Sequence, residues 1–129
     1  MRILIADDSC LCRSNLKLLF EGIASLELAE AANGVEVLEL QRSFQPDILF
    51  MDITMPLLDG LATLKILQLV APALPIVIIS SLADQRFVSR DCIANGAVAV
   101  LGKPVTKEDA LRALTKLKQA SAQQGGDPP

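Results

Sequence analysis

Five side chains of this sequence could together bind a divalent cation and a phosphoryl group. The set consists of Asp7, Asp8, Asp52, Ser80 and Lys103. Three carboxylates placed together repel one another unless a cation joins them, and Mg²⁺ prefers one or two carboxylates with water and phosphate oxygens. A carboxylate beside such an ion can attack phosphorus to give an acyl phosphate, while an ammonium and a hydroxyl bind the phosphoryl oxygens. The set therefore indicates phosphoryl transfer to an aspartate.

Asp52 is the candidate nucleophile because of the segment in which it lies. Residues 48–51 are continuously apolar, as in a strand buried on both faces, and Met55-Pro56 and Asp59-Gly60 follow closely. Ligands of open parallel sheets bind beside the carboxyl ends of the strands, where Asp52 would lie. A single aspartate after a strand more often only begins a loop, so the hypothesis depends on the other four groups converging on the same place.

The elements that must bring them together alternate along the chain. Apolar and β-branched runs predict strands at residues 2–6, 25–31, 48–51, 75–80 and 98–101. Helical spacing and capping residues predict helices that begin near Ser9, Asn33, Leu57, Asp84 and Thr106. Five such repeats specify an α/β fold, a doubly wound five-stranded parallel sheet with helices on both faces. Four of the strands end on the five chemical groups, and parallel strands present their carboxyl ends on one edge.

The predicted helix at 57–70 is apolar nearly all round. Neighbouring loops that cover a helix are the commoner cause of such an excess, and a surface for a protein partner is the alternative.

Composition limits the remaining functions. A chain of 129 residues with net charge −3 predicts one domain without the basic surface of a nucleic-acid-binding protein, so we expect no direct contact with nucleic acid. Pro72 and Pro75 interrupt the longest uncharged stretch, which excludes a membrane span there. Three cysteines without a signal-peptide pattern indicate the cytoplasm. We expect the domain at residues 1–120 and a disordered tail or truncated linker at 121–129.

The sequence resembles the receiver domain of bacterial two-component response regulators. The matching pieces are residues 4–9, residues 47–60 with Met-Pro-x-x-Asp-Gly, residues 75–80, Asn95-Gly96-Ala97 and Lys103-Pro104. Each piece alone is weak, and their combination is specific. The resemblance covers residues 1 to about 120 and implies a (βα)5 flavodoxin-like fold with strand order 2-1-3-4-5.

The resemblance also implies roles for the candidate residues. Asp52 would accept a phosphoryl group from a phosphohistidine on a sensor histidine kinase or a histidine phosphotransfer protein. Asp7, Asp8, Asp52 and the backbone carbonyl of Thr54 would hold Mg²⁺. Ser80 and Lys103 would bind phosphoryl oxygens, and the Lys103-Pro104 peptide bond is often cis in this family.

One position departs from the family pattern. An aromatic residue commonly stands three residues before the lysine and reports phosphorylation by changing its rotamer, whereas this chain has Val100. By resemblance, the output face would be formed by the fourth helix, the fifth strand and the fifth helix. An output domain beyond residue 129 and a homodimer are open possibilities.

Two other functions use the same residues. A Mg²⁺-dependent phosphatase with an aspartyl nucleophile would normally carry a second acid two residues after it, where this chain has Thr54. A receiver-like scaffold that is never phosphorylated would not need the complete set of five groups. We therefore expect a signalling switch that catalyses only its own phosphotransfer and dephosphorylation.

Overall fold

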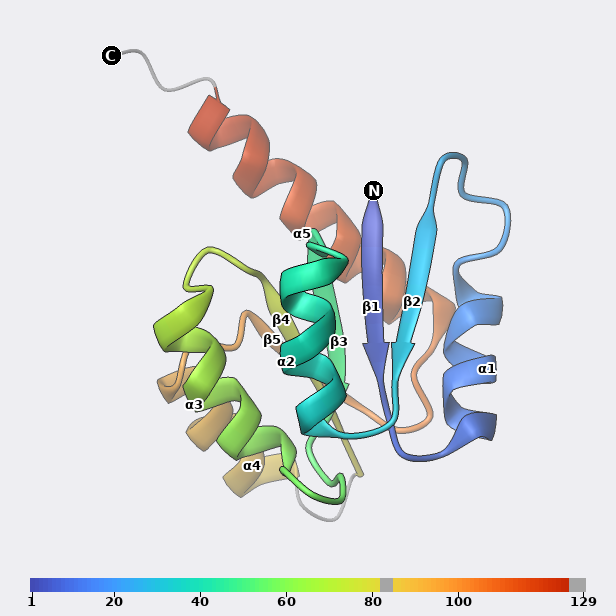
Figure 1. Cartoon of the computed structure of the whole chain (residues 1–129). Helices are drawn as coiled ribbons and strands as arrows, with labels where there is room; N and C mark the ends of the chain where they lie inside the picture. Colours follow the sequence, from blue (N-terminus) through green and yellow to red (C-terminus); the bar gives the residue numbers. More distant parts are fainter. Residues whose placement is uncertain (82–84, 126–129) are drawn as a thin grey trace.

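Strands and helices alternate five times along the chain, as the hydrophobic pattern predicts (Figure 1). The computed structural model describes residues 1–81 and 85–125, without the side chains of residues 85, 87, 88 and 118–125. The strands are β1 (Arg2–Ala6), β2 (Glu27–Ala31), β3 (Ile48–Asp52), β4 (Ile76–Ser80) and β5 (Ala99–Gly102). The helices are α1 (Cys10–Leu19), α2 (Gly34–Ser43), α3 (Gly60–Val70), α4 (Gln85–Ala94) and α5 (Lys107–Gly125).

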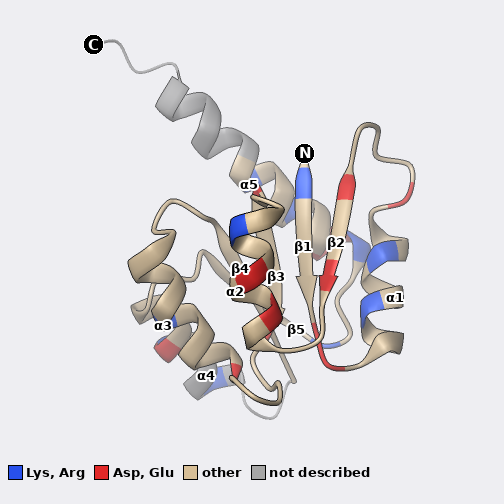
Figure 2. Cartoon of the chain, in the orientation of Figure 1, with Lys and Arg blue, Asp and Glu red and all other residues tan. Residues whose placement is uncertain are grey.

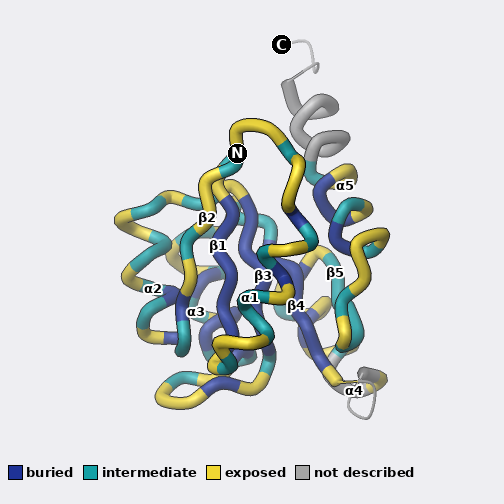
Figure 3. The backbone as a smooth tube through the Cα atoms, turned by 90° about the vertical axis from the view of Figure 1, so that its right-hand side faces the viewer, coloured by how far each residue is buried: buried dark blue, intermediate teal, exposed yellow. Residues whose placement is uncertain are grey.

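The sheet is parallel throughout, in the order β2-β1-β3-β4-β5. The predicted doubly wound α/β fold and its strand order are therefore confirmed. The inner strands β1, β3 and β4 are buried almost along their whole length (Figure 3). The edge strand β2 is largely exposed, and only its last residue, Ala31, is buried.

Two apolar layers hold the helices on opposite faces of the sheet. On one face, Leu4, Leu49 and Ile78 belong to a cluster that also contains residues of α2, α3 and α4. On the other face, Ile5 and Phe50 belong to a cluster with residues of α1 and α5. Burial of each large aliphatic or aromatic side chain contributes roughly 1.5–3 kcal/mol, so the strands are the most strongly anchored part of the chain.

Side-chain caps begin four of the helices. Ser9 accepts a hydrogen bond from the Cys12 amide, Asn33 from Glu36, Asp59 from Ala62, and Thr106 from Asp109. Each cap satisfies an amide that has no partner within its own helix. The predicted starts near Ser9, Asn33 and Thr106 are confirmed, whereas Asp84 lies outside the described residues.

The predicted start of the third helix at Leu57 is wrong. Asp59 is the N-cap of α3, and Leu57 has a φ of 67° in the turn before it. This left-handed conformation cannot continue into a helix, although Leu57 and Leu58 extend its apolar spacing. Gly60 follows directly, and a Cβ there would come within 2.6 Å of the Asp52 carbonyl oxygen. Glycine therefore allows α3 to begin against the end of β3.

Two boundaries near the N-terminus also differ from the predictions. The second strand begins at Glu27 rather than Ser25, because Ser25 has a left-handed φ of 62°. The helical spacing of apolar residues continues from Leu16 to Ile23, which predicts a longer first helix, but α1 ends at Leu19. Ile23 follows the helix and is partly buried against the same core.

The last helix is longer than predicted. It ends at Gly125 rather than near Ala120, so residues 121–125 continue the helix instead of beginning a disordered tail. Residues 121–125 include alanine and glutamine, which are good helix formers. The expectation of a tail was based on the polar, glycine- and proline-containing composition of the whole segment 121–129. Residues 126–129 of the expected tail lie outside the described residues. The boundary of the domain stays a prediction.

The outer surface mixes both signs of charge. In the view of Figure 2, basic and acidic segments are interspersed over the helices and strand ends. Within the described ranges, no helix has the length and apolar character needed to cross a bilayer.

We expect Leu57→Asn to stabilise the protein by about 1 kcal/mol. A left-handed backbone costs an ordinary L-residue roughly 1–2 kcal/mol, and asparagine tolerates it better. The Leu57 side chain is 82% exposed, so its removal sacrifices little packing. Urea denaturation followed by circular dichroism measures the change. Leu69→Asn is the matched control, because Leu69 is 84% exposed but helical. An equal gain in both variants would contradict the strain at Leu57.

Candidate functional site

The carboxyl ends of β1 and β3 bring the three predicted acids together. One carboxylate oxygen from each of Asp7, Asp8 and Asp52 lies within 4.8 Å of the other two. Ala6 pairs with Met51 in the register of these strands, so the next residue of each chain segment, Asp7 and Asp52, reaches the same edge of the sheet. Asp7 is 1% exposed and Asp52 is 5% exposed, whereas Asp8 faces solvent. The predicted convergence of the acids is therefore present in the structure.

Lys103 lies between the two buried acids. Its Nζ is 3.2 Å from Asp7 Oδ2 and 3.0 Å from Asp52 Oδ2. The residue lies in the turn after β5, where its main-chain N–H donates to the Ser80 carbonyl at 2.8 Å and the Lys103-Pro104 bond is cis, as expected. One ammonium therefore partly neutralises two carboxylates that would otherwise repel each other.

The electrostatics of this group follow from burial and mutual charge. Burial raises the pKa of Asp52, and the neighbouring Asp7 charge adds to the rise, although hydrogen bonds from Lys103 and the Thr54 amide oppose it. Burial alone would lower the pKa of Lys103, but hydrogen bonds and charge interactions with Asp52 and Asp7 raise it. Lys103 is therefore charged at neutral pH, and ionisation of Asp52 depends on the cations around it.

Ser80 lies at the same edge of the sheet, and its hydroxyl is directed toward the main chain of the next residue. Its side chain is fully buried, and its Oγ donates to the Ser81 carbonyl at 3.2 Å. Asp52 pairs with Ile79 in the register of β3 and β4, so Ser80 lies one residue beyond the neighbour of Asp52. The Thr54 amide donates to Asp52 Oδ1 at 3.2 Å. The predicted role of the Thr54 carbonyl as a metal ligand stays a prediction.

Two residues at the site were missed in the sequence. Ser9, considered only as a helix cap, donates its main-chain N–H to Asp7 Oδ1 at 2.9 Å. Arg13 donates from Nη1 to the Asp7 carbonyl at 2.7 Å. The only signal for Arg13 was its position in the first turns of the helix that follows the paired acids.

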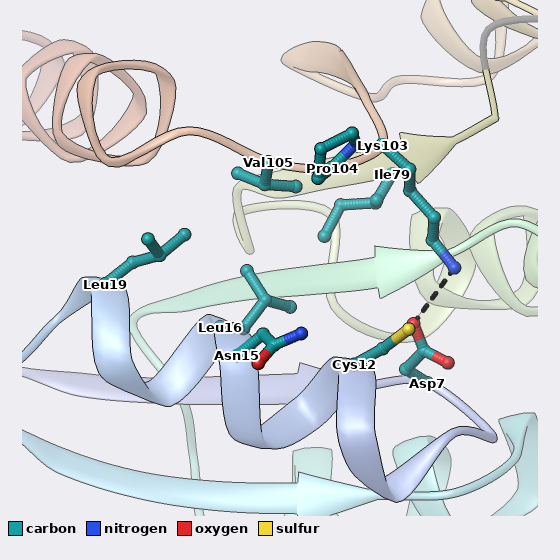
Figure 4. Close-up of a pocket in the computed structure, with 9 residues that line it drawn as sticks. All are labelled: Asp7, Cys12, Asn15, Leu16, Leu19, Ile79, Lys103, Pro104 and Val105. Carbon is teal, nitrogen blue, oxygen red and sulfur yellow. Dashed lines mark hydrogen bonds and ion pairs between the residues drawn. The ribbon is translucent and has the colours of Figure 1, made fainter.

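A mostly apolar hollow of about 280 Å³ adjoins the acids. Figure 4 shows it between α1 and the turn that carries Lys103, with the Asp7–Lys103 ion pair at one end. Leu16, Leu19 and Val105 are among its lining residues, and Cys12 projects toward Asp7. Asp7 and Lys103 therefore border this hollow, whereas Asp8 and Asp52 are not among its lining residues.

The donor set fits a hard divalent cation. It offers carboxylate oxygens on three residues, close enough for one ion to contact all of them, and no sulfur or imidazole ligand is required. Exposed Asp8 forms no hydrogen bond through its carboxylate with the residues that the structure describes, so it is available to such an ion.

Comparison with known proteins gives the family. The family model of the response regulator receiver domain matches residues 3–115. The chain is 34% identical to the chemotaxis protein CheY of Bacillus subtilis over 115 residues, covering 89% of this chain and 95% of that protein. It is 41% identical to a protein-glutamate methylesterase/protein-glutamine glutaminase of Rhodopseudomonas palustris over 105 residues, 81% of this chain. The chain spans only 28% of that relative's length.

Solved structures agree with these matches. The receiver domain of a Clostridium thermocellum response regulator superposes with a TM-score of 0.85 at 26% identity, covering 95% of this chain and 98% of the other. The response regulator domain of Thermotoga maritima CheB has a TM-score of 0.78 at 28% identity, covering 100% and 98%.

We expect Asp52→Asn to stabilise the metal-free protein at neutral pH. Because the folded-state pKa of Asp52 is raised, the stabilisation associated with its protonation is fully present below the unfolded pKa and is lost as the pH rises through the folded pKa. Asparagine avoids the cost of burying that charge, so its advantage should be largest at pH 7 and shrink in acid. Urea denaturation with a chelator across this pH range measures it. A constant difference at every pH would contradict the assignment.

Proposed function

This chain belongs to the response regulator receiver domain family, and we propose that Asp52 is the residue through which it works as a phosphoacceptor switch. The observation that carries the proposal is the Lys103 ammonium held between Asp7 and Asp52, with Asp8 close enough to share a cation. This arrangement gathers a nucleophile, a metal-binding edge and a fixed positive charge at one point. The complete set is what phosphoryl transfer to a carboxylate requires.

The reaction uses these groups without a general acid. An Asp52 carboxylate oxygen forms a bond to phosphorus as the P–N bond of a phosphohistidine breaks, and the departing imidazole nitrogen keeps the electron pair. Mg²⁺ bound by Asp7, Asp8, Asp52 and the Thr54 carbonyl would supply charge neutralisation for the phosphoryl oxygens. Lys103, already 3.0 Å from Asp52, binds one of those oxygens.

Ser80 connects the chemistry to the rest of the fold. Its hydroxyl turns from the Ser81 carbonyl toward the phosphoryl oxygen, which moves the backbone at the end of β4. Val100 is partly buried against the core and offers no aromatic ring to change position, so the change is read through the α4, β5 and α5 backbone. This switch follows the family pattern, apart from the aromatic step.

The partners follow from the donor chemistry and from the relatives. A sensor histidine kinase or a histidine phosphotransfer protein supplies the phosphoryl group in the cytoplasm. The receiver domain comprises residues 1–120. Some relatives are about as long as this chain, and others are much longer. An output domain beyond residue 129, such as a methylesterase, and a homodimer are both compatible with this reading.

The same site does not favour a phosphatase. Thr54 occupies the position of the second acid and uses its amide to bind Asp52. The chain therefore promotes only its own phosphorylation and dephosphorylation.

We expect acetyl phosphate or phosphoramidate with Mg²⁺ to add the mass of one phosphoryl group. Intact mass spectrometry should show this adduct in the wild type and lose it in Asp52→Asn. Asp47→Asn is the matched control, because this acid binds the Arg2 amide at the opposite edge of the sheet. An adduct that persists in Asp52→Asn and disappears in Asp47→Asn would overturn the assignment of the nucleophile.

A further inference from the structure

The Asp7 residue is held by hydrogen bonds on three sides. Its main-chain N–H donates to the Ala31 carbonyl at 3.0 Å, which ties the end of β1 to the end of β2. Its Oδ1 accepts from the Ser9 amide at 2.9 Å, and its main-chain carbonyl accepts from Arg13 Nη1 at 2.7 Å. These bonds leave Oδ2 directed toward Lys103 at 3.2 Å. The orientation of Asp7 is therefore set before any cation binds.

Arg13 is itself held by a second charged residue. Its Nε donates to Glu30 Oε1 at 2.9 Å, and the other oxygen of Glu30 accepts from Lys17 Nζ at 2.9 Å. Figure 2 shows the basic segments of α1 beside acidic segments of β2. The Arg13 side chain is only 16% exposed, so its two hydrogen bonds are less screened than those of an ordinary surface pair. The hydrogen bond from Lys17, with help from Arg13, lowers the pKa of Glu30 despite partial burial, which keeps this carboxylate charged.

We propose that Arg13 is a positioning residue for the metal-binding acids and that Glu30 orients it. By holding the Asp7 carbonyl, Arg13 fixes the turn between β1 and α1 that carries both Asp7 and Asp8. The inference rests on the proposed function, because it assigns a purpose to this turn only if the acids bind a divalent cation. Groups that orient metal ligands in this way typically change metal affinity by about 10–100-fold when removed.

The sign of the effect separates positioning from simple electrostatics. Arg13 carries a positive charge close to the proposed cation site, so charge alone predicts that its removal strengthens Mg²⁺ binding. Loss of positioning predicts the opposite. Lys17 provides the control, since it binds the same Glu30 carboxylate from the same helix but does not contact Asp7.

The experiment is titration calorimetry with Mg²⁺ on wild type, Arg13→Met and Lys17→Met, with urea denaturation of each variant. We expect Arg13→Met to bind Mg²⁺ roughly tenfold more weakly, and Lys17→Met to bind unchanged or more tightly. Equal or tighter binding by folded Arg13→Met would overturn the inference while leaving the metal site intact. Absence of binding by the wild type would overturn the metal site itself, and the role of Arg13 with it.

A charge-neutral variant decides the case if Arg13→Met does not fold. Lys17→Met combined with Glu30→Gln removes one charge of each sign and leaves Arg13 without the carboxylate that orients it. We expect at least about threefold weaker Mg²⁺ binding in this double variant. Unchanged affinity there would also overturn the inference.

Discussion

The ion pairs of Lys103 with Asp7 and Asp52 are the interaction on which the site depends. Both carboxylates are almost completely buried, and burial of an unpaired charge costs several kcal/mol. The Lys103 ammonium between the two carboxylates offsets part of this cost, and both carboxylates can stay ionised. Asp8, the third acid, is exposed and takes no part in these ion pairs, so a cation can contact it without breaking them.

The sheet provides the rigidity that this arrangement needs. β3 and β4 are buried at every position. Their last residues, Asp52 and Ser80, are the polar ones, so the polar side chains of the site lie at the end of the packed sheet. Apolar layers on both faces hold these strand ends in register, and Gly60 lets α3 begin against the Asp52 backbone. In the β1–α1 turn, Asp7 is held by hydrogen bonds instead: Ser9 and Arg13 donate to it, and its own amide donates to the Ala31 carbonyl.

The parts of the fold that repeat a pattern could be predicted from the sequence. Continuous apolar runs identify the strands, and parallel pairing then requires Asp7, Asp52 and Lys103 to meet at one edge. The start of α3 could not be predicted this way, because apolar spacing contains no information about the left-handed backbone of Leu57. Arg13 was missed for a related reason. It acts on a main-chain carbonyl and is oriented by Glu30, 17 residues away, so no side-chain motif contains it.

The separation of Lys103 from its partners along the chain has a consequence for biosynthesis. Lys103 follows Asp7 by 96 residues and Asp52 by 51 residues. A nascent chain that has emerged only through β4 exposes the two acids without their ammonium, and the pocket has no counterion until the segment after β5 leaves the ribosome. The ion-paired arrangement therefore forms only after most of the domain has been synthesised, and a fragment that ends before residue 103 lacks the ammonium that both acids share.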